Sequence, residues 1–322
     1  MKNFTYAAPR DIADAVRLAG HPDARFIAGG TDLLNLMKDG AQSHGAIIDL
    51  NGLALGDIVQ RDGVIRIGAL ARMSDVAAHP AVRRSLPVVS EALLNSASPQ
   101  VRNMAAVGGN VLQRTRCGYF RDSGTTCNKK TPGSGCPALE GENRGHAILG
   151  GSDHCIAVHP SDLAVALLAV DAVVLTDRRR IPFADLHVVP GTTPDQETVL
   201  GHDELITEFE IPMTPLAARS RYLKLRDRAT FEFAVVSVAA ALAMRGNTVR
   251  DVRLTFGGIA TKPWRSAEAE DALRGKPLTT TTITEAGRAL ARGAVTRDHN
   301  AFKVDLVQRA LDGLLRDMGG VR

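Results

Sequence analysis

Four cysteines are the residues of this sequence best suited to chemistry, and the chain contains no others. They lie within 39 residues, with nine, eight and eighteen residues between successive members: Cys117, Cys127, Cys136 and Cys155. Four thiolates are a common ligand set for an iron–sulfur cluster. The spacing lacks the close CxxC pairs that are typical of structural zinc sites. From the residues alone an iron–sulfur cluster, a zinc site, two disulfides and unligated thiols remain alternatives.

The segment that carries the cysteines, residues 113–156, shows no regular period. Eight glycines follow Cys117 before the last cysteine, and apolar residues are few. A loop of this length is uncommon inside a compact domain, so we expect a bound centre to organise it. Nearby basic side chains are candidates to offset the charge of a thiolate-ligated cluster: Arg114, Arg116, Arg121, Lys129 and Lys130. Three histidines lie close by in sequence, and we expect them to be solvated rather than ligands: His146, His154 and His159.

Two Gly-Gly turns are candidates to bind phosphate. The first, Gly29-Gly30, lies between an expected strand and an expected helix start, where Thr31 and Asp32 suit capping positions. Such a turn directs backbone N–H groups at a pyrophosphate. The second is Gly108-Gly109. Neither GxGxxG nor GxxxxGK[ST] occurs, so each turn alone is weak evidence, and the pair is more suggestive.

The elements around these loops mix helices and strands without regular βαβ alternation, which favours an α+β fold. We expect a hairpin through Asp62-Gly63. Helices are expected over 9–19 and 303–318, and over 73–97 with breaks at two prolines. Later strands are expected over 221–226, 234–244 and 251–259. The expected domains are residues 1–214, with the cysteine loop inserted at 113–156, and residues 215–322.

Composition limits the classes of function. The chain has 322 residues, 44% of them hydrophobic, and a net charge of +4, which is too small and dispersed for a nucleic-acid-binding protein. No run of 18 apolar residues occurs, so no membrane span is expected. No secretory signal opens the sequence, which predicts the cytoplasm, or the periplasm if a signal-bearing partner exports the complex.

Five motifs, in order along nearly the whole chain, carry a family resemblance. They are AGGTDLL at 28–34, RNMAAVGGN at 102–110, HPSDLA at 159–164, YLKLRDR at 222–228 and FGGIATKPWR at 256–265. Together they resemble the FAD-binding (medium) subunit of the molybdenum hydroxylases, the xanthine dehydrogenase and aldehyde oxidoreductase family. The resemblance implies a two-subdomain FAD-binding domain of the vanillyl-alcohol-oxidase (PCMH) type, followed by a small α+β C-terminal domain.

The cysteine loop marks a subset of that family. Here 51 residues separate Asn110 from Asp162, whereas most such subunits have a much shorter connection. The segments QRTRC at 113–117 and GSGC at 133–136 resemble the FAD subunit of bacterial heterotrimeric aldehyde oxidoreductases. Hydroxybenzoyl-CoA reductases carry a comparable insertion. The resemblance therefore implies a [4Fe–4S] cluster on the four cysteines; a zinc-stapled interaction module without redox function is the remaining alternative.

The resemblance also implies particular cofactor residues. The FAD pyrophosphate is expected against Ile27, Ala28, Gly29, Gly30, Thr31, Asp32, Leu33 and Leu34. A second cofactor loop would comprise Ala106, Gly109 and Asn110. Asp162 would hold a cofactor hydroxyl or order that loop, and Lys224 is either near the flavin ring or an exposed strand lysine.

The same resemblance implies that no substrate carbon chemistry occurs on this chain, so it has no catalytic residues. A large subunit with molybdopterin would oxidise an aldehyde to a carboxylic acid. A small subunit with two [2Fe–2S] clusters would complete a heterotrimer and pass electrons to this FAD, which would reduce an external acceptor. In a hydroxybenzoyl-CoA reductase the electrons would run in the opposite direction.

Overall fold

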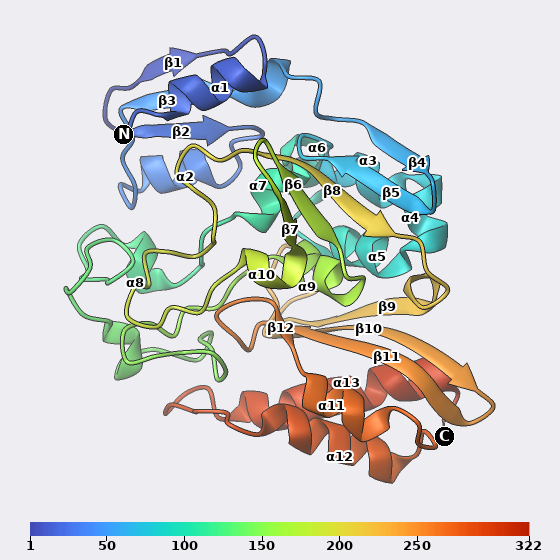
Figure 1. Cartoon of the computed structure of the whole chain (residues 1–322). Coiled ribbons are helices and arrows are strands. Elements are labelled where there is room, and N and C mark those ends of the chain that lie inside the picture. Colours follow the sequence, from blue (N-terminus) through green and yellow to red (C-terminus); the bar gives the residue numbers. More distant parts are fainter. Residues whose placement is uncertain (322) are drawn as a thin grey trace.

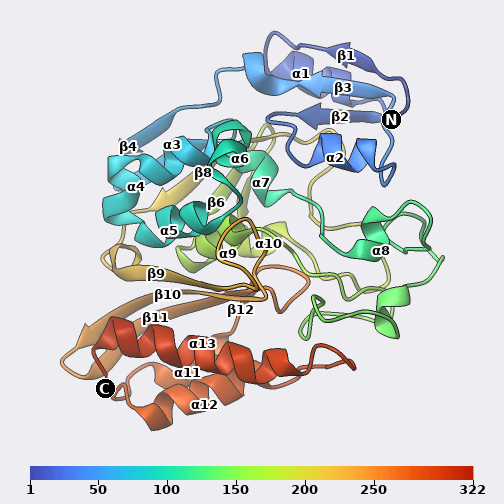
Figure 2. The same ribbon diagram turned by 180° about the vertical axis from the view of Figure 1, so that it is seen from behind.

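The computed structural model describes residues 1–321 as three layers, each built around its own β-sheet (Figure 1). The N-terminal sheet lies at one end of the molecule, and the C-terminal helices lie at the other end. The view from behind shows the same order of layers, with the cysteine loop at one side (Figure 2). Within residues 1–321 no helix is long and apolar enough to cross a membrane.

The first layer is a small parallel sheet of strand order β1-β3-β2, formed by Thr5–Ala7, Ala46–Asp49 and Ala24–Ile27. Helix α1 (Ile12–Ala19) packs its alanine-rich face on this sheet, with Ala15 and Ala19 buried. The side chain of Asp11 accepts a hydrogen bond from the Asp14 N–H and so starts the helix at Ile12, three residues later than the sequence predicts. Helix α2 (Leu33–Lys38) follows β2 after the first Gly-Gly turn.

The second layer is a five-stranded antiparallel sheet of order β4-β5-β8-β6-β7. The predicted hairpin joins β4 to β5, because both Asp62 and Gly63 adopt positive φ, at 52° and 77°. Pro80 and Pro87 divide the next segment into three short helices, as predicted, because each proline begins a new helix. The bounds are β4 Ile58–Arg61, β5 Val64–Gly68, α3 Met73–Ala78, α4 Pro80–Ser85, α5 Pro87–Asn95, α6 Pro99–Met104, α7 Val107–Val111, α9 Asp162–Ala169, β6 Val173–Thr176, β7 Arg180–Pro182, α10 Phe183–Leu186 and β8 Ile206–Pro212.

Helix α9 packs between elements of the second layer and the third sheet. All eight of its residues are buried, so it packs on every side. Its neighbours include α5, α7 and strands of the third sheet. Because α9 begins at Asp162, the packing of this helix fixes the position of that carboxylate.

The third layer is an antiparallel sheet of order β12-β11-β10-β9. Its apolar face packs against the three C-terminal helices, and their shared core includes Phe256, Leu290 and Leu311. The bounds are β9 Ser220–Leu225, β10 Val236–Arg245, β11 Thr248–Gly257, β12 Trp264–Arg265, α11 Ala267–Leu273, α12 Thr280–Ala291 and α13 Phe302–Gly319. The predicted strands and the last predicted helix are confirmed, and the mixture of elements confirms the α+β class.

The cysteine loop protrudes beside these layers and has almost no regular structure, as predicted. Its one α-helix among the described residues is α8 (Gly118–Arg121). The C-terminal layer fixes the end of the loop: Lys303 Nζ, fully buried, donates to the His146 carbonyl at 2.9 Å. The Asn143 side chain accepts a hydrogen bond from the His299 N–H at 3.0 Å.

Candidate cofactor sites

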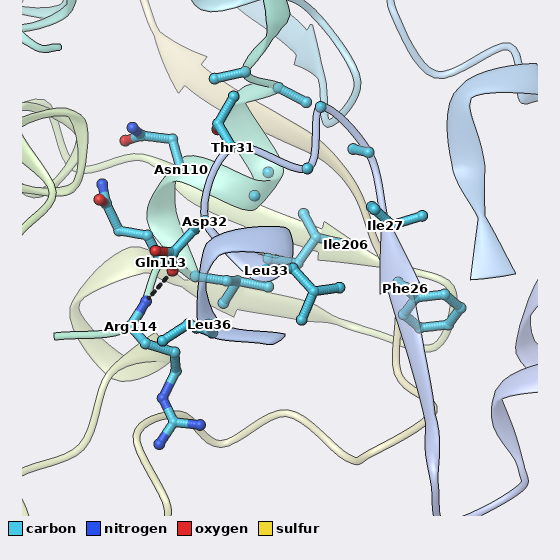
Figure 3. A pocket seen from close by; sticks show the side chains of 18 of the residues that line it. Phe26, Ile27, Thr31, Asp32, Leu33, Leu36, Asn110, Gln113, Arg114 and Ile206 are labelled. Atoms are coloured by element: carbon cyan, nitrogen blue, oxygen red, sulfur yellow. Dashed lines mark hydrogen bonds between the residues drawn. The ribbon is translucent and has the colours of Figure 1, made fainter. Parts of the chain in front are cut away.

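A cavity of about 1050 Å³ lies where the first two layers meet the connection between β9 and β10. This volume suits a dinucleotide-sized ligand. It is lined by almost every residue that the resemblance assigns to the cofactor: Ile27, Ala28, Gly29, Gly30, Thr31, Asp32, Leu33, Ala106, Gly109, Asn110, Asp162 and Lys224. Leu34 is the exception, since its side chain turns back over Gly30. Figure 3 shows lining residues of this cavity, including Thr31 and Asp32 of the first loop and Asn110 of the second.

Two glycines give the first cofactor loop its shape. A Cβ on Gly29 would lie 2.0 Å from the Met104 carbonyl oxygen, so only glycine allows the loop to approach the second cofactor segment this closely. Gly30 has φ of 68°, in the left-handed region that glycine favours. These two requirements explain why the sequence has a Gly-Gly pair here.

A polar bridge joins the first loop to the second. Asn51 Nδ2 donates to the Ala28 carbonyl at 2.9 Å, and Arg72 Nη2 donates to Asn51 Oδ1 at 3.0 Å. Arg72 Nη1 also donates to the Met104 carbonyl at 2.6 Å. Sequence reasoning missed Asn51 and Arg72, because neither belongs to a Gly-rich motif.

The second loop presents an open backbone to the cavity. Gly109 lines the cavity, and a Cβ on it would meet no atom within 4 Å, so the loop leaves room there for a ligand. Asn110 Oδ1 accepts a hydrogen bond from Ser161 Oγ at 2.7 Å, and Ser161 also caps α9. The second cofactor loop is thus fixed to the helix that carries Asp162.

Asp162 is the centre of a buried hydrogen-bond network. Its Oδ2 accepts from Ser96 Oγ at 2.9 Å and from Lys224 Nζ at 2.8 Å. Its Oδ1 accepts from Tyr222 Oη at 2.6 Å. Burial first, and then the Asp162 charge, hold the pKa of Tyr222 well above its usual value, so the phenol remains a donor. None of these three partners belongs to the second cofactor loop, so the role of Asp162 toward the cofactor stays a prediction.

Lys224 is not the exposed strand lysine that the sequence left open as an alternative. Only 1% of its side chain is accessible, and Nζ also donates to the Asn95 carbonyl at 3.1 Å. Tyr222 and Lys224 are two positions apart on β9 and therefore lie on the same face of the strand. This period of two in the sequence would have placed Tyr222 on the same face as Lys224 and so identified it as a candidate site residue.

Asp32 occupies the N-cap position of α2 as predicted, but its side chain does not cap the helix. The carboxylate turns instead to the cysteine loop, where Oδ2 accepts from the Arg114 N–H at 2.8 Å (Figure 3). Oδ1 accepts from Arg121 Nη2 at 2.7 Å and from Arg116 Nη1. Burial alone would raise the pKa of Asp32, but the Arg116 charge and these hydrogen bonds outweigh it and lower the pKa.

A second, much smaller cavity contains all four cysteines in its lining, and its volume of about 10 Å³ is close to that of a single water molecule. The four cysteines are free thiols in the structure. Over residues 1–321 no group of three or more His, Cys, Asp or Glu side chains has the arrangement that holds one metal ion. The four sulfurs therefore surround a common space but do not converge on one point.

Backbone N–H groups point at these sulfurs. Those of Tyr119 and Phe120 bond to Cys117, although burial is stronger and raises the pKa of that thiol to about 11. Cys136 and Cys155 share a hydrogen bond, which lowers the pKa of Cys136 and raises that of Cys155. Further N–H groups bond to Cys136 and Cys155: those of Ala138, Leu139, Ile156 and Ala157. N–H donors of this kind stabilise thiolates and tune bound clusters.

The expectation that the nearby histidines are solvated is wrong for two of them. His146 is buried, and its Nε2 lies 3.2 Å from Cys117 Sγ. His159 Nε2 lies 3.2 Å from the Val111 carbonyl, whereas His154 is exposed as expected.

The basic side chains of the loop mostly have partners other than sulfur. Arg116 and Arg121 bind Asp32, as described above. Lys129 Nζ lies 2.8 Å from a carboxylate oxygen of Glu197, and Arg114 pairs with the same carboxylate. Lys130 Nζ donates to the Thr125 carbonyl at 2.8 Å. Lys129 is close enough to Cys155 for its charge to favour the thiolate.

Comparison with known proteins identifies the class to which these sites belong. Residues 2–214 match the FAD binding domain in molybdopterin dehydrogenase, and residues 221–318 match the CO dehydrogenase flavoprotein C-terminal domain. The chain therefore belongs to the family of FAD-binding medium subunits of the molybdenum hydroxylases, which are oxidoreductases.

Individual relatives agree with this class. The chain is 46% identical to the aldehyde oxidoreductase FAD-binding subunit PaoB of Escherichia coli, with 98% of each chain covered. It is 27% identical to the carbon monoxide dehydrogenase medium chain of Hydrogenophaga pseudoflava, covering 89% of this chain and 85% of that one. A solved structure of that carbon monoxide dehydrogenase superposes with a TM-score of 0.75 at 25% identity, over 97% of this chain and 96% of the other. These matches confirm the expected fold and family.

Proposed function

We propose that this chain is the FAD and [4Fe–4S] electron-transfer subunit of a molybdenum-dependent aldehyde oxidoreductase. One observation carries the proposal: every cysteine of the chain lines one small cavity, with backbone N–H groups directed at the sulfurs, in the segment next to an FAD-sized cavity. A flavin exchanges single electrons with iron–sulfur carriers and electron pairs with an external acceptor. This chemistry fits a subunit that has no substrate-converting residues of its own.

The spacing of the cysteines favours a cluster over a zinc ion. Structural zinc sites are typically built from CxxC-like pairs, and the chain has none. Four cysteines are a common ligand set for a [4Fe–4S] cluster. In this proposal Cys117, Cys127, Cys136 and Cys155 are the four ligands.

The residues of the large cavity support FAD binding by this chain. The first loop offers a backbone shaped by Gly29 and Gly30, and the second offers the open edge at Gly109. We assign the FAD-binding domain to residues 1–214, with the cluster loop at 113–156, and the C-terminal α+β domain to residues 215–322. The two family matches, at 2–214 and 221–318, support this division.

The relatives support the assignment of substrate and partners. The relative with 46% identity is named as the FAD-binding subunit of an aldehyde oxidoreductase, which favours an aldehyde over a hydroxybenzoyl-CoA substrate. We assign molybdopterin to a large partner subunit and two [2Fe–2S] clusters to a small one, with electrons passing through this chain to an external acceptor. We assign the complex to the cytoplasm, or to the periplasm if a partner carries the export signal.

Replacement of a proposed ligand tests the cluster. Cys127→Ser removes a buried ligand, so we expect the iron and sulfide of the anaerobically purified chain to fall strongly. Ser123→Ala changes an exposed residue of the same loop and is the control. Unchanged iron in Cys127→Ser would exclude this residue as a ligand.

Assembly with the two partners tests the electron path. Addition of an aldehyde to the heterotrimer should bleach the flavin absorbance of this subunit within the turnover time. A flavin that stays oxidised while the partners are reduced by the same aldehyde would contradict the proposed path.

A further inference from the structure

The helix that follows the first cofactor loop is fixed directly to the cysteine loop, and Asp32 is the main contact. We infer that Asp32 is a positioning residue: it fastens the first cofactor loop to the cysteine loop, so that FAD retention depends on that loop being assembled around its cluster. This inference rests on the proposed function, since it presumes that the cysteines bind a cluster.

The polar part of the contact uses both carboxylate oxygens of Asp32. One accepts from the Arg114 N–H at 2.8 Å, and the other from the Arg116 and Arg121 guanidinium groups, the latter at 2.7 Å. Arg121 is itself fixed, because its Nε donates to the Thr115 carbonyl at 2.9 Å. All these donors belong to residues 114–121, which include the first proposed cysteine ligand, Cys117.

The apolar part of the contact lies one helical turn further along. Leu36 of α2, with 1% of its surface accessible, packs against Phe120 and Cys127 in a small core that Cys117 borders. Two proposed cluster ligands are therefore in the same apolar group as the helix of the phosphate-binding turn. Movement of these cysteines would transmit directly to Leu36.

The order of the cysteine loop depends on its bound cluster, because this loop has less apolar packing than the rest of the chain. Residues 113–156 contribute few side chains to the large apolar cores, and the small core around Leu36 is one of their few apolar contacts with the first layer. Because a segment without a hydrophobic core is ordered mainly by what it binds, loss of the cluster would release the donors that hold Asp32. The first cofactor loop would then lose its fixed position beside the cavity.

Two substitutions test the contact from its two sides. Asp32→Asn keeps the shape of the side chain but removes its charge, and Arg121→Gln removes the charged guanidinium group that donates to Asp32 Oδ1. Arg121 does not line the large cavity, so an effect of its substitution on FAD cannot come from lost contact with the cofactor. We expect each variant of the full chain to raise the FAD dissociation constant about tenfold or more, the range for one lost charge-assisted hydrogen bond.

Asp227→Asn is the matched control. Asp227 also pairs with an arginine of the cysteine loop, Arg144, but both side chains are about half exposed. We expect its FAD dissociation constant to stay within about twofold of wild type, because exposed ion pairs contribute little. Circular dichroism and iron content, measured on the same samples, show whether each variant is folded and loaded.

Removal of the cluster from the wild-type chain with an iron chelator under argon is the second test. The rate of FAD release, followed by flavin fluorescence, should rise about tenfold after the iron is lost, and should return to its former value when the cluster is rebuilt with iron and sulfide. Unchanged FAD affinity in Asp32→Asn and Arg121→Gln, or unchanged FAD release after iron removal, would overturn the inference. A wild-type chain that contains no iron or sulfide would instead contradict the proposed function.

Discussion

Replacement of Lys224 with Met is the perturbation whose cost can be worked out most fully from the structure. The Lys224 side chain is 1% accessible and its partner Asp162 is 5% accessible, so the ion pair is buried. Methionine has nearly the same length and shape, and it removes the ammonium group without opening a large cavity. Asp162 then keeps only two hydroxyl donors, from Ser96 and Tyr222.

The expected loss of stability follows from what remains buried. Leaving one member of a buried ion pair without its partner costs about 3–5 kcal/mol. The Asn95 carbonyl also loses a donor, a cost already contained in that range. Replacing both members, as in Lys224→Met with Asp162→Asn, removes both charges, so the double variant should be less destabilised than the sum of the two single variants. Exposed Asp227→Asn should cost less than about 1 kcal/mol.

Urea unfolding is the appropriate assay, since Trp264 is the only tryptophan of the chain and lies in the third sheet together with Lys224. Tryptophan fluorescence and circular dichroism should report the same shift in midpoint. We also expect weaker FAD binding by Lys224→Met, because Lys224 and Asp162 line the large cavity. A loss below about 1 kcal/mol would refute the reasoning, because it would mean that water or another group satisfies Asp162 without the ammonium.

Three further predictions concern other buried groups. Burial lowers the pKa of His187 to about 4. Below pH 6.5 the unfolded chain therefore binds more protons at this residue than the folded chain does. On account of His187, the free energy of unfolding should fall by about 1.3 kcal/mol from pH 7.5 to pH 5.5. His187→Gln should show a shallower fall over that range in urea titrations. Burial, followed by the Arg144 charge, lowers the pKa of Lys303 to about 7. The free energy of unfolding should therefore rise by about 2 kcal/mol between pH 7 and pH 9 on account of Lys303. The variant Lys303→Met should lack this increase. Ser161→Ala removes both the side-chain cap of α9 and the hydrogen bond to Asn110. It should lower the free energy of unfolding by about 1–2 kcal/mol, measured by calorimetry.

Local patterns predict much of the fold. The Asp62-Gly63 hairpin, the breaks at Pro80 and Pro87, and the last helix all depend on interactions within a few residues, so the sequence contains the relevant information. The grouping of the four cysteines around one cavity was expected from their shared loop and its lack of apolar residues.

Contacts between distant segments account for what the sequence did not predict. Asp32 has the residue type of a helix cap. Its carboxylate instead accepts hydrogen bonds from donors in the cysteine loop, more than 80 positions away in the sequence. The partners of Lys224 come from α5 and α9, so periodicity on β9 alone could not tell a buried lysine from an exposed one. The basic residues expected near sulfur are drawn instead to Asp32 and Glu197.

Metal and flavin analysis of the chain purified without oxygen tests the central claim most directly. The proposed function predicts about four iron and four sulfide atoms with one FAD for each chain, and almost no zinc. Zinc without iron and sulfide, or a chain that cannot bind added FAD, would contradict it.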